Sequence, residues 1–216
     1  MSTLTKEYKQ FLNENFKGLT IRKPLFYNWD KGLRFDLQVG ETGTEEYFLE
    51  VVNRANTLFQ AAFNPEDVVY FVLYDYKSKR SRIRFSNYGF KQIKDLRRNE
   101  ISYSKLRQLY YPDDRLDIWN TAVLKLTTDR INFKNILTAI GHTDFPSRQP
   151  GIGQEIYFIN INKKLIFNMY DHRGLDIMAA DIETLRPIYK KFNDWILDYD
   201  REQIDRIMDK DGIYTV

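Results

Sequence analysis

The sequence predicts an α+β fold: a mostly antiparallel sheet built from hairpins, with two long amphipathic helices packed against it. Apolar residues recur at helical spacing over residues 44–63 and again over residues 182–199, which predicts the two helices. Several β-prone stretches are separated by short turns that contain Asp, Asn or Gly, and this pattern predicts hairpins. Helices and hairpins in separate segments of one chain are typical of an α+β architecture.

The same signals place the other elements. The turn at residues 30–32 predicts a hairpin, because Gly32 tolerates the positive φ of a tight turn. The continuous apolar run at 68–74 predicts a strand that is buried on both faces and central in the sheet. Pro187 lies too deep in the last long helix for a first turn, so that helix kinks or restarts there. The remaining expected elements are helices at 4–16, 90–97, 133–140 and 200–209, and strands at 25–29, 33–39, 107–111, 119–127, 155–161, 165–170 and 175–178.

The expected organisation is a single compact domain of residues 1–216. The loop at 142–153, rich in Pro and Gly, could instead join two sub-lobes at 1–141 and 154–216. Residues 29–37 and 170–177 both run from an aromatic residue and Asp through a turn glycine into a strand, and a helix follows each. This similarity has two explanations. Either the chain contains two duplicated ββα-type halves, or hairpins in general need Asp and Gly at their turns.

Composition limits the possible functions. The chain of 216 residues has no Cys, which excludes thiolate chemistry and cysteine-ligated zinc. Its formal charge of +3 is too mild to indicate nucleic acid or acidic membranes by itself. The first residues lack the apolar core of a signal peptide, and no run of about 18 apolar residues occurs. We therefore expect a cytoplasmic protein with no membrane association, cofactor or bound metal.

The best candidate binding residues surround two aromatic side chains. His172, beside Asp171 and Arg173, could act as a general base or contact phosphate. The simpler interpretation is a polar turn in which Asp171 caps backbone N–H groups. We expect aromatic anchors and charged turn residues to form a contact surface for a protein partner. The residues of this expected surface are Trp29, Asp30, Tyr170, Asp171, His172, Arg173 and Asp176.

Two other functions stay open. Asp75 and Lys77 follow the central strand, and with an earlier Asp36 or Asp67 they could hold Mg²⁺ in a nuclease or another phosphate-acting enzyme. The basic residues within 77–98, a segment that starts at Lys77 and ends at Arg98, could bind nucleic acid. No phosphate loop, serine-esterase elbow or zinc-protease helix motif occurs. We therefore favour a non-catalytic protein over an enzyme.

The last third of the chain resembles a known family. The matching segments are 156–160, 169–176, 183–187 and 193–201. Together they resemble the bacterial domain-of-unknown-function family numbered 3885, whose usual motif is Tyr-Asp-Asp-Arg-Gly. Here His172 replaces the second Asp, which weakens the idea of a metal-binding acidic pair. The family has no assigned activity. By analogy with other compact α+β immunity proteins, the resemblance implies a small intracellular binding protein that inhibits a toxin.

Overall fold

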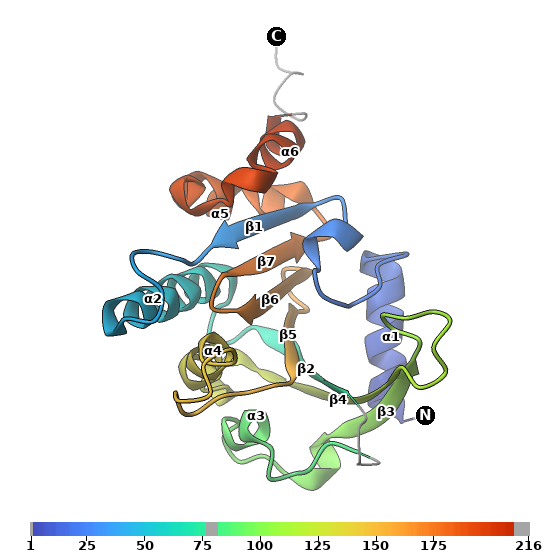
Figure 1. The fold of residues 1–216 in the computed structure, drawn as a ribbon. Coiled ribbons are helices and arrows are strands. Elements are labelled where there is room, and N and C mark those ends of the chain that lie inside the picture. The colour runs from blue at the N-terminus through green and yellow to red at the C-terminus, as the bar shows by residue number, and fades with distance from the viewer. Residues whose placement is uncertain (1, 77–81, 210–216) are drawn as a thin grey trace.

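The protein is built on one seven-stranded antiparallel sheet, as seen in a computed structural model that describes residues 2–76 and 82–209 (Figure 1). The strand order is β1-β7-β6-β5-β2-β4-β3, and every neighbouring pair is antiparallel. The strands are β1 (Gly32–Asp36), β2 (Val68–Tyr76), β3 (Ser102–Arg107), β4 (Ile118–Thr127), β5 (Glu155–Asn160), β6 (Leu165–Asp171) and β7 (Gly174–Ala179). The predicted mostly antiparallel α+β fold is confirmed.

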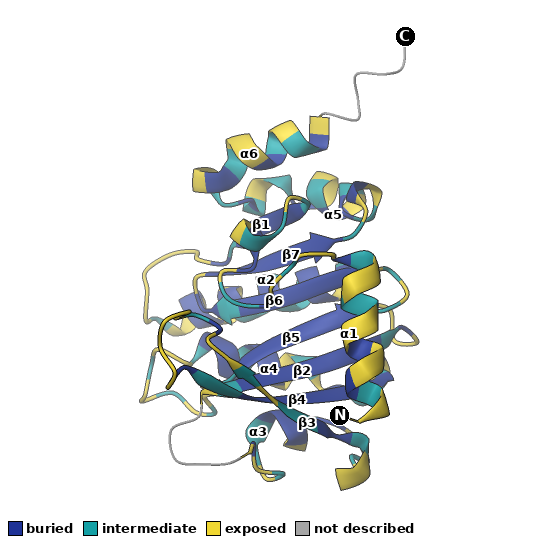
Figure 2. Ribbon diagram, turned by 90° about the vertical axis from the view of Figure 1, so that its right-hand side faces the viewer, coloured by how far each residue is buried: buried dark blue, intermediate teal, exposed yellow. Residues whose placement is uncertain are grey.

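Helices cover both faces of the sheet (Figure 2). In that view α1 lies in front of the sheet, and α2 and α4 lie behind it. The α-helices are α1 (Thr3–Asn15), α2 (Glu45–Ala62), α3 (Tyr88–Lys91), α4 (Phe133–Gly141), α5 (Arg186–Lys191) and α6 (Asp198–Asp209). Short 3₁₀ helices are η1 (Phe26–Asn28), η2 (Arg98–Glu100), η3 (Thr128–Arg130), η4 (Ile182–Thr184) and η5 (Asn193–Trp195). Cover on both faces explains why the inner strands are continuous apolar runs.

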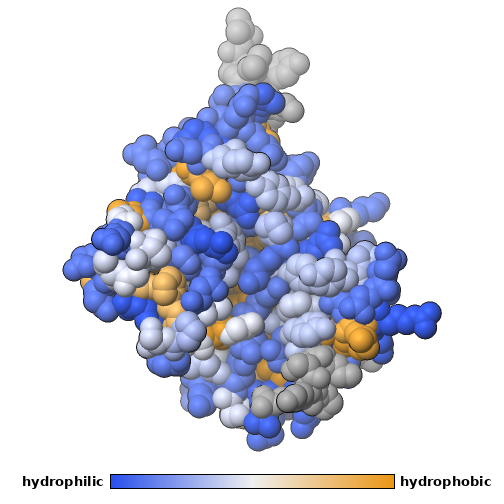
Figure 3. Space-filling model, in the orientation of Figure 1, coloured by the Kyte–Doolittle hydropathy of each residue, from blue (hydrophilic) through white to orange (hydrophobic). Residues whose placement is uncertain are grey.

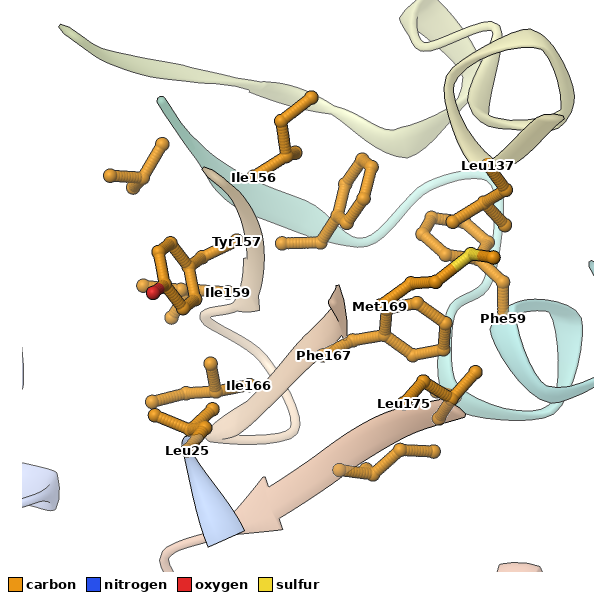
Figure 4. Packing of buried hydrophobic residues seen from close by; sticks show 14 of the residues in the cluster. Leu25, Phe59, Leu137, Ile156, Tyr157, Ile159, Ile166, Phe167, Met169 and Leu175 are labelled. Carbon is orange, nitrogen blue, oxygen red and sulfur yellow. The ribbon is translucent and has the colours of Figure 1, made fainter. Parts of the chain in front are cut away.

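The core lies on both faces of the sheet. Figure 4 shows Phe167 pointing towards Phe59 and Leu137, whereas Ile166 points to the opposite side, where Leu25 lies. This alternation follows from the two-residue period of a strand. Helix α2 begins where the Thr44 side chain accepts the N–H of the residue three positions on, and its apolar face packs on the sheet. The predicted long helix at 44–63 is therefore confirmed.

The predicted strand at 25–29 is wrong. Phe26–Asn28 form η1, and the Phe26 N–H donates to Asp176 Oδ2 at 3.0 Å instead of to a sheet neighbour. Strand β1 consequently forms no hairpin with the preceding residues and pairs with β7, from Gly32 opposite Met178 onwards. The first of the two expected ββα-type halves thus lacks its first strand.

The second long helix expected at 182–199 is broken into η4, α5 and η5. The expected restart occurs at Arg186, with Pro187 in the first turn of α5, where proline has no N–H to lose. The helical segment ends because residues 196–197 join the sheet edge. Ile196 forms a bridge with Phe35, and the Leu197 N–H donates to the Arg34 carbonyl at 2.9 Å. Part of the free edge of β1 is thereby covered.

The connection after β3 also differs from expectation. The strand predicted at 107–111 is wrong, because β3 ends at Arg107 and Gln108 takes a positive φ of 54°. The Asp117 carboxylate then accepts the N–H groups of Tyr110 and Tyr111, which holds these residues in a loop. Helix α3 is shorter than the helix expected at 90–97 and lies slightly earlier.

The loop at 142–153 does not divide the sheet. Strands β5 to β7, which follow the loop, lie between β1 and β2, which precede it. This interleaving supports a single domain of residues 1–216, which stays a prediction. Within the described ranges, the helices all lack the combination of length and apolar character that crossing a bilayer requires.

Candidate functional site

A cleft of about 540 Å³ opens where β5 begins and β6 ends, beside the loop between β3 and β4. Figure 2 shows this loop at the left of the sheet. The walls combine aromatic rings with groups of both charges. The lining residues are Lys23, Pro24, Arg34, Tyr110, Tyr111, Trp119, Glu155, Tyr170, Asp171 and Arg173. A concave surface with a few converging polar groups is the usual form of a binding site.

Arg34 is the most buried cation of the cleft. It lies in β1 directly opposite Asp176 of β7, and its Nε donates to Asp176 Oδ1 at 2.9 Å. Its Nη1 lies 3.6 Å from Asp200 Oδ2. The guanidinium also lies over the rings of Tyr27 and Tyr170, at 4.7 and 5.2 Å from their centroids. Such stacking suits the weakly hydrated guanidinium and fixes its place at the cleft.

Asp176 is fully buried beneath this cation. Its second oxygen accepts the Phe26 N–H, so both oxygens have partners. Burial raises the pKa of Asp176 to about 6, while the nearby Arg34 opposes that rise. Asp176 therefore links three segments of the interior and offers no surface to a partner.

The motif at 170–174 shapes one wall of the cleft. Asp171 Oδ1 accepts the Arg173 N–H at 2.7 Å, and its carboxylate pairs with the Arg173 guanidinium. The pairing of β6 with β7 is irregular between Met169 and Asp171, where Tyr170 lies. A Cβ at Gly174 would collide with the Tyr170 hydroxyl and lie 2.6 Å from the Phe35 carbonyl oxygen. Glycine at this position therefore lets the Tyr170 ring lie across the hairpin, next to Arg34.

The opposite wall is a hydrogen-bonded group around Glu155. The Tyr110 hydroxyl donates to Glu155 Oε1 at 2.7 Å, and the Tyr157 hydroxyl donates to Oε2 at 2.6 Å. The Tyr110 hydroxyl also accepts the Lys23 N–H at 2.8 Å. Lys23 Nζ donates to the Tyr170 carbonyl at 3.3 Å, which connects the two walls. These contacts fix the cleft without the help of a ligand.

Exposed apolar side chains occur in the cleft lining and on the elements next to it. Tyr111 is 67% exposed and Leu116 is 74% exposed, and both belong to the loop between β3 and β4. Trp119 also lines the cleft, with its ring 5.2 Å from that of Tyr110 and 5.4 Å from that of the half-exposed Tyr76. We call Tyr76, Tyr111, Leu116 and Trp119 the aromatic rim. In the view of Figure 3, apolar surface occurs as separate spots on a largely hydrophilic face.

Comparison with known proteins assigns the chain to a family. Residues 8–200 match the family described as a domain of unknown function, DUF3885. The chain belongs to the DUF3885 family. A relative from Bacillus subtilis (strain 168), described as uncharacterized protein YnaE, is 24% identical over 209 residues, covering 88% of this chain and 96% of the relative. No solved structure matches the chain.

The structure of this DUF3885 chain separates the residues expected to share one surface. Tyr170, Asp171 and Arg173 line the cleft. Trp29 and Asp30 line a different hollow near the other end of β7, where Trp29 Nε1 donates to the Ala179 carbonyl at 2.8 Å. The two groups are separated by the length of β7, roughly 17 Å at the usual rise per residue. They line two separate hollows, and a shared contact surface stays a prediction.

His172 does not line the cleft of this DUF3885 chain. It is buried, its Nδ1 lies 2.6 Å from the Tyr47 hydroxyl, and its ring packs edge-on against Phe145. Its Nε2 lies 3.7 Å from Asp144 Oδ2, and one oxygen of Asp171 lies within 4.8 Å of these groups. These three residues are potential metal ligands. Because Asp171 already pairs with Arg173, a cation would have to compete for it.

The residues considered for a nuclease in this DUF3885 chain are not brought together. Asp67 and Asp75 are at opposite ends of β2, roughly 26 Å apart at the rise of a strand. Asp36 ends β1, four strand positions from β2, or roughly 19 Å. Asp75 accepts a hydrogen bond from Gln154 at 2.9 Å. Lys77 lies outside the described residues.

The motif at 170–174 does not predict most of the residues that line the cleft of this DUF3885 chain. The missed lining residues are Lys23, Pro24, Arg34, Tyr110, Tyr111, Trp119 and Glu155. The sequence contains one indication of the cleft. Two adjacent tyrosines precede Pro112 in a connecting segment, which is unusual for a loop that only joins strands. Arg34 gives no such signal, because its acidic partners Asp176 and Asp200 are far away in sequence.

Proposed function

We propose that this protein is a non-catalytic, cytoplasmic protein-binding module that holds its partner on the cleft and the aromatic rim. The observation that carries the proposal is the exposure of Tyr111, which lines a preformed cleft, together with that of Leu116 in the same loop. Exposed tyrosine and tryptophan side chains next to a pocket are the usual anchors of protein interfaces. A single hydrophobic ligand would not need a rim that extends beyond the cleft.

The state of the cleft's acidic groups favours binding over catalysis. Glu155 accepts hydrogen bonds from two tyrosine hydroxyls, and Asp171 is paired with Arg173. A general base needs a free lone pair directed at the proton that it removes. Both carboxylates of the lining are instead used to hold the walls.

The partner should present an acidic side chain next to an apolar one. Lys23, Arg34 and Arg173 give the lining three cations against two carboxylates. Arg34 pairs with Asp176 and Asp200, and Arg173 pairs with Asp171, so among the described residues Lys23 is the lining cation without an ion pair. An acidic group on the partner would pair with Lys23, while an apolar neighbour would cover the rim.

The narrower proposal is an immunity-type inhibitor that occludes a toxin. It is supported by analogy with other compact α+β immunity proteins. If a toxin gene adjoins the gene for this chain, co-expression should protect cells, and a variant with Tyr111→Ala and Leu116→Ala should not.

Affinity purification tests the proposed contact. A tagged chain from its native cells is compared with the Tyr111→Ala/Leu116→Ala variant and with a control that carries Leu49→Ala and Tyr199→Ala. The control residues are 68% and 86% exposed and lie on α2 and α6. We expect the rim variant to lower recovery of a stoichiometric partner by about tenfold or more, with an unchanged melting temperature. Equal recovery with the rim variant and the control would contradict the contact.

A further inference from the structure

A second hollow, of about 390 Å³, lies apart from the cleft. It is formed by the segment after the described end of β2, by the start of η2 and by β3. Ile83 is buried within it, and the side chains around it are aromatic or basic. The lining residues are Arg82, Ile83, Arg84, Phe85, Ser86, Arg98 and Tyr103. In contrast to the cleft, this lining contains no carboxylate.

The three arginines of the hollow form no ion pair with an acidic residue of the described segments. Among the described residues, none of Arg82, Arg84 and Arg98 forms an ion pair, whereas the nearby Arg130 pairs with Glu100 at 2.7 Å. Residues 82–98 contain six Lys and Arg residues against one acidic residue, in a chain with a formal charge of only +3. The positive charge is thus local, which the overall charge conceals.

Each of two aromatic rings of the hollow has a guanidinium group over it. The Arg98 guanidinium lies 4.8 Å from the centroid of Phe85, and that of Arg82 lies 5.9 Å from the centroid of Tyr103. Both rings are half-buried and pack against the hydrophobic core, so one side of each is fixed in the protein. A planar ligand could stack on such a ring while the arginine turns to bind its phosphate.

We propose that this hollow binds a nucleotide unit, either as a free nucleotide or within a single strand of RNA or DNA. Unpaired guanidinium groups match phosphate oxygens, because the planar fork donates two parallel hydrogen bonds. The rings supply a surface for the base. The volume lies in the range of small-ligand sites. A duplex keeps its bases stacked inside and cannot place one on Phe85 or Tyr103. The site is separate from the cleft and does not depend on the proposed partner.

The test measures binding of adenosine monophosphate by calorimetry and of a fluorescent ten-nucleotide single strand by anisotropy, both at low salt. Arg84→Ala and Arg98→Ala should each weaken binding by about tenfold or more. Phe85→Leu keeps an apolar side chain but removes the ring, and it should weaken nucleotide binding without affecting inorganic phosphate. Arg206→Ala, on exposed α6, is the charge-matched control and should have little effect.

Tighter binding of the strand than of the monophosphate would assign the site to a nucleic acid, and the reverse would assign it to a free nucleotide. Lack of binding of both probes would overturn the proposal. An equal loss in Arg206→Ala would also overturn it, because the attraction would then be general. So would equally tight binding of an acidic peptide that depends on Arg84, since the hollow would then be an anionic protein contact.

Discussion

Replacing Arg34 with methionine should lower the free energy of unfolding by about 3–5 kcal/mol at pH 7. The substitution leaves the Asp176 carboxylate fully buried with no cation beside it. Methionine roughly fills the space of the arginine stem, so the loss reports mainly on charge. Denaturant unfolding of the variant and the wild type at one pH gives the difference.

The loss should shrink in acid. The pKa of Asp176 in the folded protein, about 6, lies above its ordinary value of 3.8. The stability that this proton contributes is complete below the ordinary pKa and is lost as the pH rises through the folded pKa. Removal of Arg34 raises the folded pKa further, so the variant loses more stability at pH 7 than at pH 4.

A second substitution separates charge from packing. Asp176→Asn added to Arg34→Met removes the unpaired carboxylate and keeps an oxygen for the Phe26 N–H, so we expect most of the lost stability to return. A double variant less stable than Arg34→Met, or a single variant within about 1 kcal/mol of wild type, would show that this pair does not hold the three segments together.

Gly174→Ala should destabilise the fold by about 3 kcal/mol, the upper end for overpacking a buried site. The new Cβ would collide with the Tyr170 hydroxyl and lie 2.6 Å from the Phe35 carbonyl oxygen. Because Phe35 belongs to β1, its carbonyl cannot move without disturbing the sheet. Thermal or denaturant unfolding measures the change.

Two further variants test this explanation. At Gly151 an added Cβ meets nothing within 4 Å, so Gly151→Ala should stay within about 0.5 kcal/mol of wild type. Tyr170→Phe in the Gly174→Ala background removes only the hydroxyl contact, so it should rescue stability in part. Full rescue would mean that the Phe35 carbonyl does not crowd the added Cβ. Equal effects of Gly174→Ala and Gly151→Ala on stability would contradict the explanation by crowding at Gly174.

The sequence predicts local structure where local chemistry decides it. Helix α2 follows from the apolar spacing and the Thr44 cap, and the interior strand β2 follows from its continuous apolar run. The strand expected at 25–29 fails because Asp176, about 150 residues away, takes the backbone N–H of Phe26. Contacts at such separation leave no local pattern.

The candidate site likewise contains residues whose role follows from local sequence and residues whose role depends on distant segments. The turn role of Asp171 is visible in the sequence, because an Asp that precedes a two-residue turn often accepts a backbone N–H of that turn. Asp176 looks like another charged turn residue, yet the pairing of β1 with β7 buries it opposite Arg34. A strand pairing between residues 32–36 and 174–178 cannot be deduced from either segment alone.

The motif therefore acts on the cleft chiefly through Tyr170. The Gly174 position lets the Tyr170 ring lie beside Arg34, and Tyr170 in turn accepts Lys23 Nζ at its carbonyl. The proposed partner contact depends on this wall and on the loop that carries Tyr111.

Site-specific photo-cross-linking tests the proposed contact most directly. A photoreactive phenylalanine analogue is placed at Tyr111 and, in separate chains, at the exposed Leu49 and Tyr199, and each chain is irradiated in the cells that produce it. A partner on the cleft and rim predicts one discrete protein adduct from position 111 and none from positions 49 and 199. No adduct from position 111, or the same adducts from all three positions, would contradict the proposal.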